Sequence, residues 1–126
     1  MSKKQIFTVE YPVRCSPSIL YEFLSTPAGL QEWFADKVDE RDNVFSFSWN
    51  GTTDRAVVTE SEAEKFIRFH WMESPPEEFF EFRIEKSEVT NQTILVISDF
   101  AGKGELKDQT QLWGFQVKDL FHRLGN

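Results

Sequence analysis

The C-terminal segment "KDQTQLWGFQVKDLFHRLGN" (residues 107–126) decides the fold, because it has the pattern of one long amphipathic helix. Its apolar residues recur at positions i, i+4, i+7, i+8 and i+11. They are Trp113, Val117, Leu120, Phe121 and Leu124. Asp108 is expected to cap the start, and Gly125 suits the left-handed residue that follows a helix. About 17 helical residues make a rod of about 25 Å, which can cross several strands.

The segments before this helix predict strands, because apolar and polar residues alternate in them with a period of two. These segments are "QIFTVEYPV" (5–13), "NVFSFSW" (43–49), "RAVVTE" (55–60), "KFIRFHWM" (65–72) and "FFEFRIEK" (79–86). A sixth, "QTILVISDF" (92–100), is more continuously apolar and is therefore expected inside the sheet. Turn signals such as "NGT" (50–52) and "SPPEE" (74–78) separate the strands, which favours an antiparallel meander.

Two short helices are expected between the first strand and the others. Each begins with a capping residue followed by proline, at Ser16–Pro17 and at Thr26–Pro27. Pro27 also ends the first helix, since the residue before a proline is disfavoured in the helical region. In the second helix the spacing predicts one apolar face made by Leu30, Trp33 and Phe34.

The predicted fold class is α+β, a curved antiparallel sheet of about six strands that grips the long C-terminal helix. Its 126 residues suggest a single domain. The chain contains 13 Phe, 4 Trp and 2 Tyr, so 15% of it is aromatic. Rings are rigid and cannot bend into gaps as methionine does. We therefore expect space between the helix and the concave face of the sheet.

Three segments carry a resemblance that covers essentially the whole chain. They are "SPSILYEFLSTPAGLQEWFAD" (16–36), "EKFIRFHW" (64–71) and "LWGFQVKDLFHRL" (112–124) with its Trp113–Gly114 pair. In this order they resemble the helix-grip superfamily of START-related and birch-pollen-allergen-like (SRPBCC) domains, and most of all the branch of the activator of the heat-shock-protein-90 ATPase. The resemblance implies the fold, whereas the superfamily hosts lipid carriers, cyclases, stress-linked binders and co-chaperone modules. Those co-chaperones carry a further N-terminal domain that docks on the chaperone, so their activity is not expected here.

The aromatic residues on the predicted concave face have two interpretations that remain open. They form either the wall of a pocket of about 300–1,000 Å³ for a lipid-like or planar aromatic molecule, or a closed core without a cavity. The candidate ligand-binding residues are Trp33, Phe34, Phe47, Trp49, Phe69, Trp71, Phe80, Phe82, Trp113, Val117 and Phe121. Gly114 lies within the helix, where it would allow close approach of a ligand or close packing under a ring.

The charge pattern leaves a protein partner possible and disfavours others. The formal net charge is −7, which argues against nucleic acid and against an anionic membrane surface. Residues 60–88 contain nine Glu and four basic residues. This acidic face is either a docking surface for a basic protein partner, which would make the chain a protein-interaction or co-chaperone-like domain, or the solvated outer side of the sheet. Arg68 and Arg83 are expected to form solvated cross-strand pairs there rather than to bind an anionic head group.

A role as a cyclase- or hydrolase-like enzyme is less expected than a binding role. Asp99 shares strand parity with Leu95 and Ile97, so its carboxyl group is a weak candidate for an acid or base at the pocket mouth. The alternative, that the strand ends before Asp99 and leaves it in solvent, is preferred. The two histidines, His70 and His122, have no partners at metal-ligand spacing, and no metal or cofactor is expected.

Targeting signals are not evident in the sequence. The N-terminal "MSKKQIFTVEY" lacks the apolar region of a signal peptide, and no stretch reaches the about 20 apolar residues of a membrane span. Cys15 is the only cysteine, so no intrachain disulfide is expected. We expect a cytoplasmic protein that does not insert into membranes.

Overall fold

A computed structural model describes residues 4–125. Residues 1–3 of the N-terminal segment and Asn126, the last residue of the C-terminal segment quoted above, lie outside the described residues. Within that range the chain forms one antiparallel sheet of seven strands with the spatial order β1-β7-β6-β5-β4-β3-β2. The strands are β1 (Gln5–Val13), β2 (Lys37–Arg41), β3 (Val44–Trp49), β4 (Thr52–Glu62), β5 (Phe66–Trp71), β6 (Phe80–Lys86) and β7 (Thr93–Ala101). The helices are α1 (Pro17–Ser25), α2 (Pro27–Gln31) and α3 (Leu106–Leu124).

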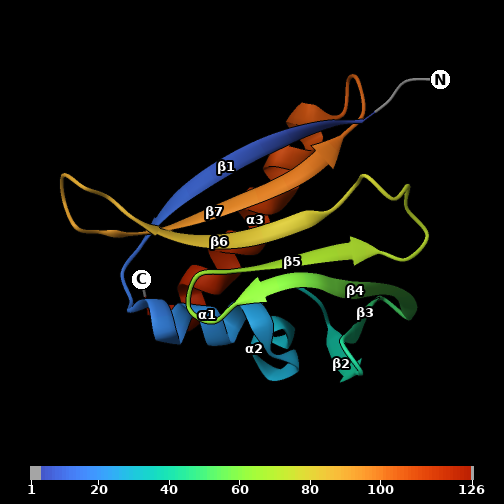
Figure 1. Cartoon of the computed structure of the whole chain (residues 1–126), viewed down its shortest axis with the longest axis horizontal. Coiled ribbons are helices and arrows are strands. Elements are labelled where there is room, and N and C mark those ends of the chain that lie inside the picture. The colour runs from blue at the N-terminus through green and yellow to red at the C-terminus, as the bar shows by residue number, and fades with distance from the viewer. Residues whose placement is uncertain (1–3, 126) are drawn as a thin grey trace.

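The helix-grip architecture is confirmed. Figure 1 shows α3 lying across one face of the curved sheet, with α1 and α2 following β1 along the chain. The "QTILVISDF" segment lies inside the sheet as β7, between β1 and β6. The predicted hairpin at Asn50–Gly51 is present, and both residues have positive φ angles (50° and 83°), as a tight two-residue turn requires.

The sheet has seven strands rather than about six. The additional strand is β2, which lacks the alternation of apolar and polar residues that predicted the other strands. It is an edge strand paired only with β3, through a turn at Asp42 and Asn43 with φ angles of 52° and 67°. Only Val38 of its five residues is buried. A strand that buries one side chain shows no apolar alternation, and its charges protect an open sheet edge from unwanted pairing.

Both short helices begin as predicted, but the second ends earlier. Ser16 Oγ accepts a hydrogen bond from the Ile19 amide (3.3 Å), and Thr26 Oγ1 accepts one from the Gly29 amide (3.0 Å). Since α2 ends at Gln31, Trp33 and Phe34 lie in the turn that follows it, not on a helical face. The turn is held by Trp33 Nε1, which donates to the carbonyl oxygen of Phe23 on α1 (2.8 Å).

Gly29 explains how α1 and α2 meet at a sharp joint. A Cβ atom at this position would collide with the carbonyl oxygen of Glu22 and would lie 2.6 Å from Cα of Phe23. The backbones of the two helices are therefore closer than any side chain at residue 29 permits. The turn that follows α2 then lies against the concave face of the sheet, where Phe34 packs on Phe80 and Phe82 of β6.

The long helix α3 has 19 residues and begins at Leu106. The prediction that Asp108 caps it is wrong, because Asp108 lies in the first turn and the N-cap residue Glu105 makes no side-chain cap hydrogen bond. Glu105 Oε1 instead accepts from the amide of Gly102 (2.8 Å), within the loop before the helix. The C-terminal prediction is confirmed, since Gly125 is left-handed with φ of 78°.

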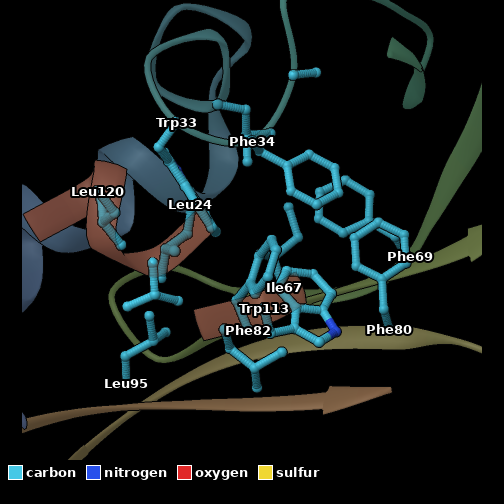
Figure 2. Packing of buried hydrophobic residues seen from close by; sticks show 14 of the residues in the cluster. Leu24, Trp33, Phe34, Ile67, Phe69, Phe80, Phe82, Leu95, Trp113 and Leu120 are labelled. Carbon is cyan, nitrogen blue, oxygen red and sulfur yellow. The ribbon is translucent and has the colours of Figure 1, made fainter. Parts of the chain in front are cut away.

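The core lies between the concave face and the helices and is dominated by rings. Figure 2 shows Trp113 from α3 and Phe34 from the turn after α2 gathered with Phe80 and Phe82 of β6. Phe69 stacks on Phe80 with ring centroids 4.8 Å apart. This centre is closed, since Phe47, Phe69, Phe80 and Phe82 are at most 1% exposed.

Candidate functional site

A cavity of about 390 Å³ lies beside this core, between the N-terminal half of α3, the end of β7 and the loop that joins β5 to β6. Its lining residues are Lys4, Phe34, Trp49, Trp71, Ser74, Glu78, Phe79, Phe80, Asp99, Phe100, Gln109, Leu112, Trp113 and Gln116. The cavity therefore draws on segments from both ends and the middle of the chain, which only the folded sheet brings together.

The structure divides the eleven candidate ligand-binding residues between wall and core. The five that line the cavity are Phe34, Trp49, Trp71, Phe80 and Trp113. Phe47, Phe69, Phe82 and Val117 are packed in the closed core with at most 1% exposure. Trp33 packs on Phe82, and Phe121 contacts Tyr11 edge-on with centroids 6.3 Å apart. The pocket and core interpretations thus apply to different parts of one aromatic set.

Several lining residues were not singled out from the sequence. Gln109 and Gln116 lie at i−4 and i+3 from Trp113, so the helical period would have placed them beside it. Phe79 and Phe100 pack edge-on with centroids 5.1 Å apart at the rim. Lys4, Ser74 and Glu78 come from segments outside regular elements, for which the sequence has no periodic signal.

The aromatic wall is held in place by hydrogen bonds at its edges. The carbonyl oxygen of Phe34 accepts from Trp49 Nε1 (2.8 Å) and from Gln116 Nε2 (3.0 Å). The Phe34 ring stacks on Trp113 with centroids 5.7 Å apart and an interplanar angle of 14°. The turn after α2 is thereby joined to both β3 and α3, which fixes the ring positions around the cavity.

Asp99 points into the cavity, contrary to the preferred expectation. The strand β7 continues to Ala101, so Asp99 keeps the inward parity of Leu95 and Ile97. Its Oδ2 accepts from Trp113 Nε1 (2.9 Å) and its Oδ1 from the Phe100 amide (2.8 Å).

The ionisation of Asp99 reflects two opposing influences. Burial raises the pKa of its carboxyl group above 3.8, and the negative charge of Glu78 acts in the same direction. The hydrogen bonds from Phe100 and Trp113 and the positive charge of Lys4 oppose this rise. Lys4 and Glu78 face each other at the rim, with 4.0 Å between Nζ and Oε1.

Gly114 serves neither of the purposes expected for it. A Cβ atom there would meet only the hydroxyl oxygen of Tyr11, at an ordinary contact distance of 3.9 Å. The residue is absent from the cavity lining and lies under no ring that a methyl group would displace.

On the outer side of the sheet, Arg68 forms the expected cross-strand pair, with Glu81 of β6, whereas Arg83 pairs with the same Glu81 within β6. The expectation that these pairs are solvated is wrong for their shared partner, which is buried. Glu81 is 5% exposed and accepts from Arg68 (2.9 Å) and Arg83 (3.1 Å). The other glutamates of residues 60–88 are spread over β4 and the β4–β5 turn, the β5–β6 loop, β6 and the β6–β7 turn, so they do not gather on one strand. Among residues 4–125, no three His, Cys, Asp or Glu side chains gather where they could hold a metal ion.

Comparison with known proteins gives one family and a set of similar structures. The family model described as the START-like superfamily domain matches residues 1–126. A Bacteroides fragilis protein solved by solution NMR is 35% identical, with a TM-score of 0.68, over 97% of this chain and 92% of that one. No curated protein matches the sequence.

Two more distant structures share the fold alone. The Aha1 dimer from Colwellia psychrerythraea is 19% identical, with a TM-score of 0.76 over 93% of each chain. A Mesorhizobium loti protein is 18% identical, with a TM-score of 0.76 over 96% of this chain and 97% of that one. None of the helices within residues 4–125 is long and apolar enough to cross a membrane.

Proposed function

The chain belongs to the START-like superfamily, whose domains commonly bind hydrophobic molecules, and from this membership we propose that it binds a small hydrophobic molecule in the cavity beside Trp113. The ligand would lie between α3 and the concave face of the sheet. Its contacts would come from the aromatic wall, with Asp99 and the rim residues fixing its orientation.

The observation that carries the proposal is a cavity of about 390 Å³ whose wall resists collapse. This volume lies within the range of about 300–1,000 Å³ that is usual for small-molecule sites. Closing the cavity would require Phe34 or Trp113 to move. Moving the Trp113 indole would break its hydrogen bond to Asp99, and moving the Phe34 backbone would break those from Trp49 and Gln116 to its carbonyl oxygen. Leaving such groups unpaired costs about 1–3 kcal/mol each, so these bonds oppose collapse of the wall.

The test compares two tryptophan substitutions on α3. Gln109 lines the cavity, whereas Gln111, two residues further along, is exposed and outside the lining. The Gln109→Trp variant should weaken binding of the neutral fluorescent probe N-phenyl-1-naphthylamine by about tenfold or more, because the new indole occupies the cavity. The Gln111→Trp control should bind the probe as the parent does. Equal affinity in the two variants would refute the cavity as the binding site.

Native mass spectrometry of the freshly purified protein addresses the natural ligand. A retained mass that is present in the Gln111→Trp control and lost in Gln109→Trp would identify the molecule held by this cavity. If the same mass is retained by both variants, the ligand binds elsewhere on the chain.

A second candidate function, acid–base chemistry, is favoured by the inward position of Asp99. Its carboxyl group lies in the cavity wall, and burial raises its pKa. An enzyme would convert the retained molecule during incubation, which changes its mass or, for an isomerisation, its NMR spectrum, and Asp99→Asn would abolish that change. An unchanged mass and an unchanged NMR spectrum of the ligand in the parent protein support binding without chemistry.

A further inference from the structure

We propose that the cavity selects an organic cation, meaning a hydrophobic molecule that carries a quaternary ammonium or protonated amine group. The inference deepens the proposed function and rests on it, because it concerns the ligand class of the same cavity. Three properties of the lining support it: its free carboxylate oxygens, its net charge and the type of its rings.

Three donors in the wall are already used by the protein. Trp113 Nε1 donates to Asp99, and Trp49 Nε1 donates to the Phe34 carbonyl. The side-chain amide of Gln116 also donates to the Phe34 carbonyl, which leaves its Oε1 as an acceptor. The other donors of the lining belong to Lys4, Ser74, Trp71 and Gln109.

Acceptors also remain available in the wall, and they belong to carboxylate groups. Each oxygen of Asp99 accepts one hydrogen bond from the protein and has capacity for a second. Glu78 adds another carboxylate, whose side chain is 15% exposed. A positively charged group of a ligand can thus contact carboxylate oxygens in the cavity wall.

The charges that line the cavity sum to one negative charge. They belong to Lys4, Glu78 and Asp99. Lys4 is the more exposed member of the rim pair, at 45%, and its ammonium group lies 4.0 Å from Glu78. The single positive charge of Lys4 acts on both Glu78 and Asp99, so one carboxylate charge stays unbalanced. A cation would supply the missing positive charge, and the partly buried position of Asp99 would strengthen the attraction.

The rings of the wall also suit a cation. Three of the four tryptophans of the chain line the cavity, namely Trp49, Trp71 and Trp113. The indole face is the aromatic surface that attracts cations most strongly, and cages of such rings bind quaternary ammonium groups. Because the same rings bury apolar surface, one molecule with an apolar body and a weakly hydrated cationic group satisfies both properties.

The inference is tested with three probes of nearly one shape, each a benzyl group attached to a tetrahedral head. Benzyltrimethylammonium is positive, neopentylbenzene is its neutral isostere, and phenylmethanesulfonate is negative. Affinities are measured by NMR titration of the tryptophan indole signals. The cation should bind about tenfold more tightly than the neutral isostere, and the anion more weakly than both.

Charge-removing variants locate the preference. Asp99→Asn and Glu78→Gln should each lower the ratio of cation affinity to neutral affinity by about threefold or more. Asp39→Asn, which removes one charge from an exposed side chain on β2, should leave the ratio unchanged. A general loss of binding would lower both affinities and leave their ratio unchanged. If Asp99→Asn does not fold, the result for Glu78→Gln still decides the test.

The outcomes separate this inference from the proposed function. If N-phenyl-1-naphthylamine binds in the cavity but benzyltrimethylammonium does not exceed its neutral isostere, the charge inference is overturned and the binding function survives. If the preference is equally reduced by Asp39→Asn, it reflects the net charge of the chain, which also overturns the inference. Failure of N-phenyl-1-naphthylamine to respond to Gln109→Trp overturns the proposed function itself.

Discussion

Trp113 on α3 donates a hydrogen bond of 2.9 Å from Nε1 to Oδ2 of Asp99 on β7, and this bond joins the helix to the sheet at the cavity wall. It places a partly buried carboxylate against the edge of an indole ring that also stacks on Phe34. One contact therefore anchors α3, fixes one of the three indole rings of the wall and keeps an acidic group inside the cavity. The shape of the cavity and the acidic group in its wall therefore depend on the same two residues, Trp113 and Asp99.

This arrangement predicts how stability depends on pH. The partly buried Asp99 carboxyl group has a raised pKa, so the folded protein retains its proton to a higher pH than the unfolded chain, where the pKa is 3.8. As the pH falls through the folded-state pKa towards 3.8, this group should raise the free energy of unfolding, with no further gain below that value. Asp99→Asn should lack this contribution.

The measurement is the difference in unfolding free energy between the parent and Asp99→Asn, followed across about pH 3 to 6. The carboxyl carbon of Asp99 provides a direct check by NMR, and its titration midpoint should lie above 3.8. A midpoint at or below 3.8 would contradict the prediction, because the hydrogen bonds from Trp113 and Phe100 would then outweigh burial.

The fold was predictable because its elements repeat simple periods. The apolar spacing of α3, the alternation within β3, β5 and β6 and the Ser16 and Thr26 caps all match the structure. The exceptions have local causes. Edge strand β2 buries only Val38, and α2 is too short for its periodicity to show where it ends.

The site was less predictable, since parity assigns a side chain to a face of the sheet but not to a position along it. Phe47 and Trp49 share the concave face of β3, yet the first is sealed in the core and the second lines the cavity. That difference depends on where α3 and the turn after α2 cover the sheet. The rim residues Lys4 and Glu78 meet through loop geometry, for which no sequence period exists.

Gly29→Ala should destabilise the protein strongly. The added methyl group would collide with backbone atoms of Glu22 and Phe23, which cannot move without separating α1 from α2. We expect a loss of about 2–3 kcal/mol in the free energy of unfolding, measured by urea denaturation. A variant as stable as the parent would show that the joint between the helices is looser than this contact implies.

Gly114→Ala, the same substitution on α3, should have the opposite sign. The methyl group finds only the Tyr11 hydroxyl at 3.9 Å, so it adds no clash. Alanine restricts the unfolded chain and favours the helix, which should stabilise the protein by about 0.5–1 kcal/mol. The urea midpoint should therefore rise at an unchanged slope. A fall in the midpoint would indicate that Gly114 allows a close contact after all.

Glu81→Gln should destabilise the protein by about 1–2 kcal/mol, because Glu81 is the buried partner of two arginines. The effect stays below that of a fully buried pair, since the side chains of Arg68 and Arg83 are 31% and 37% exposed. Their guanidinium groups also rest on the rings of Phe79 (3.9 Å) and Phe66 (4.4 Å), contacts that survive the substitution.

The matched control is Glu62→Gln, which removes an exposed pair with Lys65 in the β4–β5 turn. It should change the free energy of unfolding by less than about 0.5 kcal/mol, because solvent screens such pairs. Urea denaturation of both variants at low and high salt gives the comparison. Equal losses in the two variants would mean that burial adds nothing to the Glu81 pairs. The two arginines would then be held mainly by their aromatic neighbours, and removing either ring should cost more than removing the carboxylate.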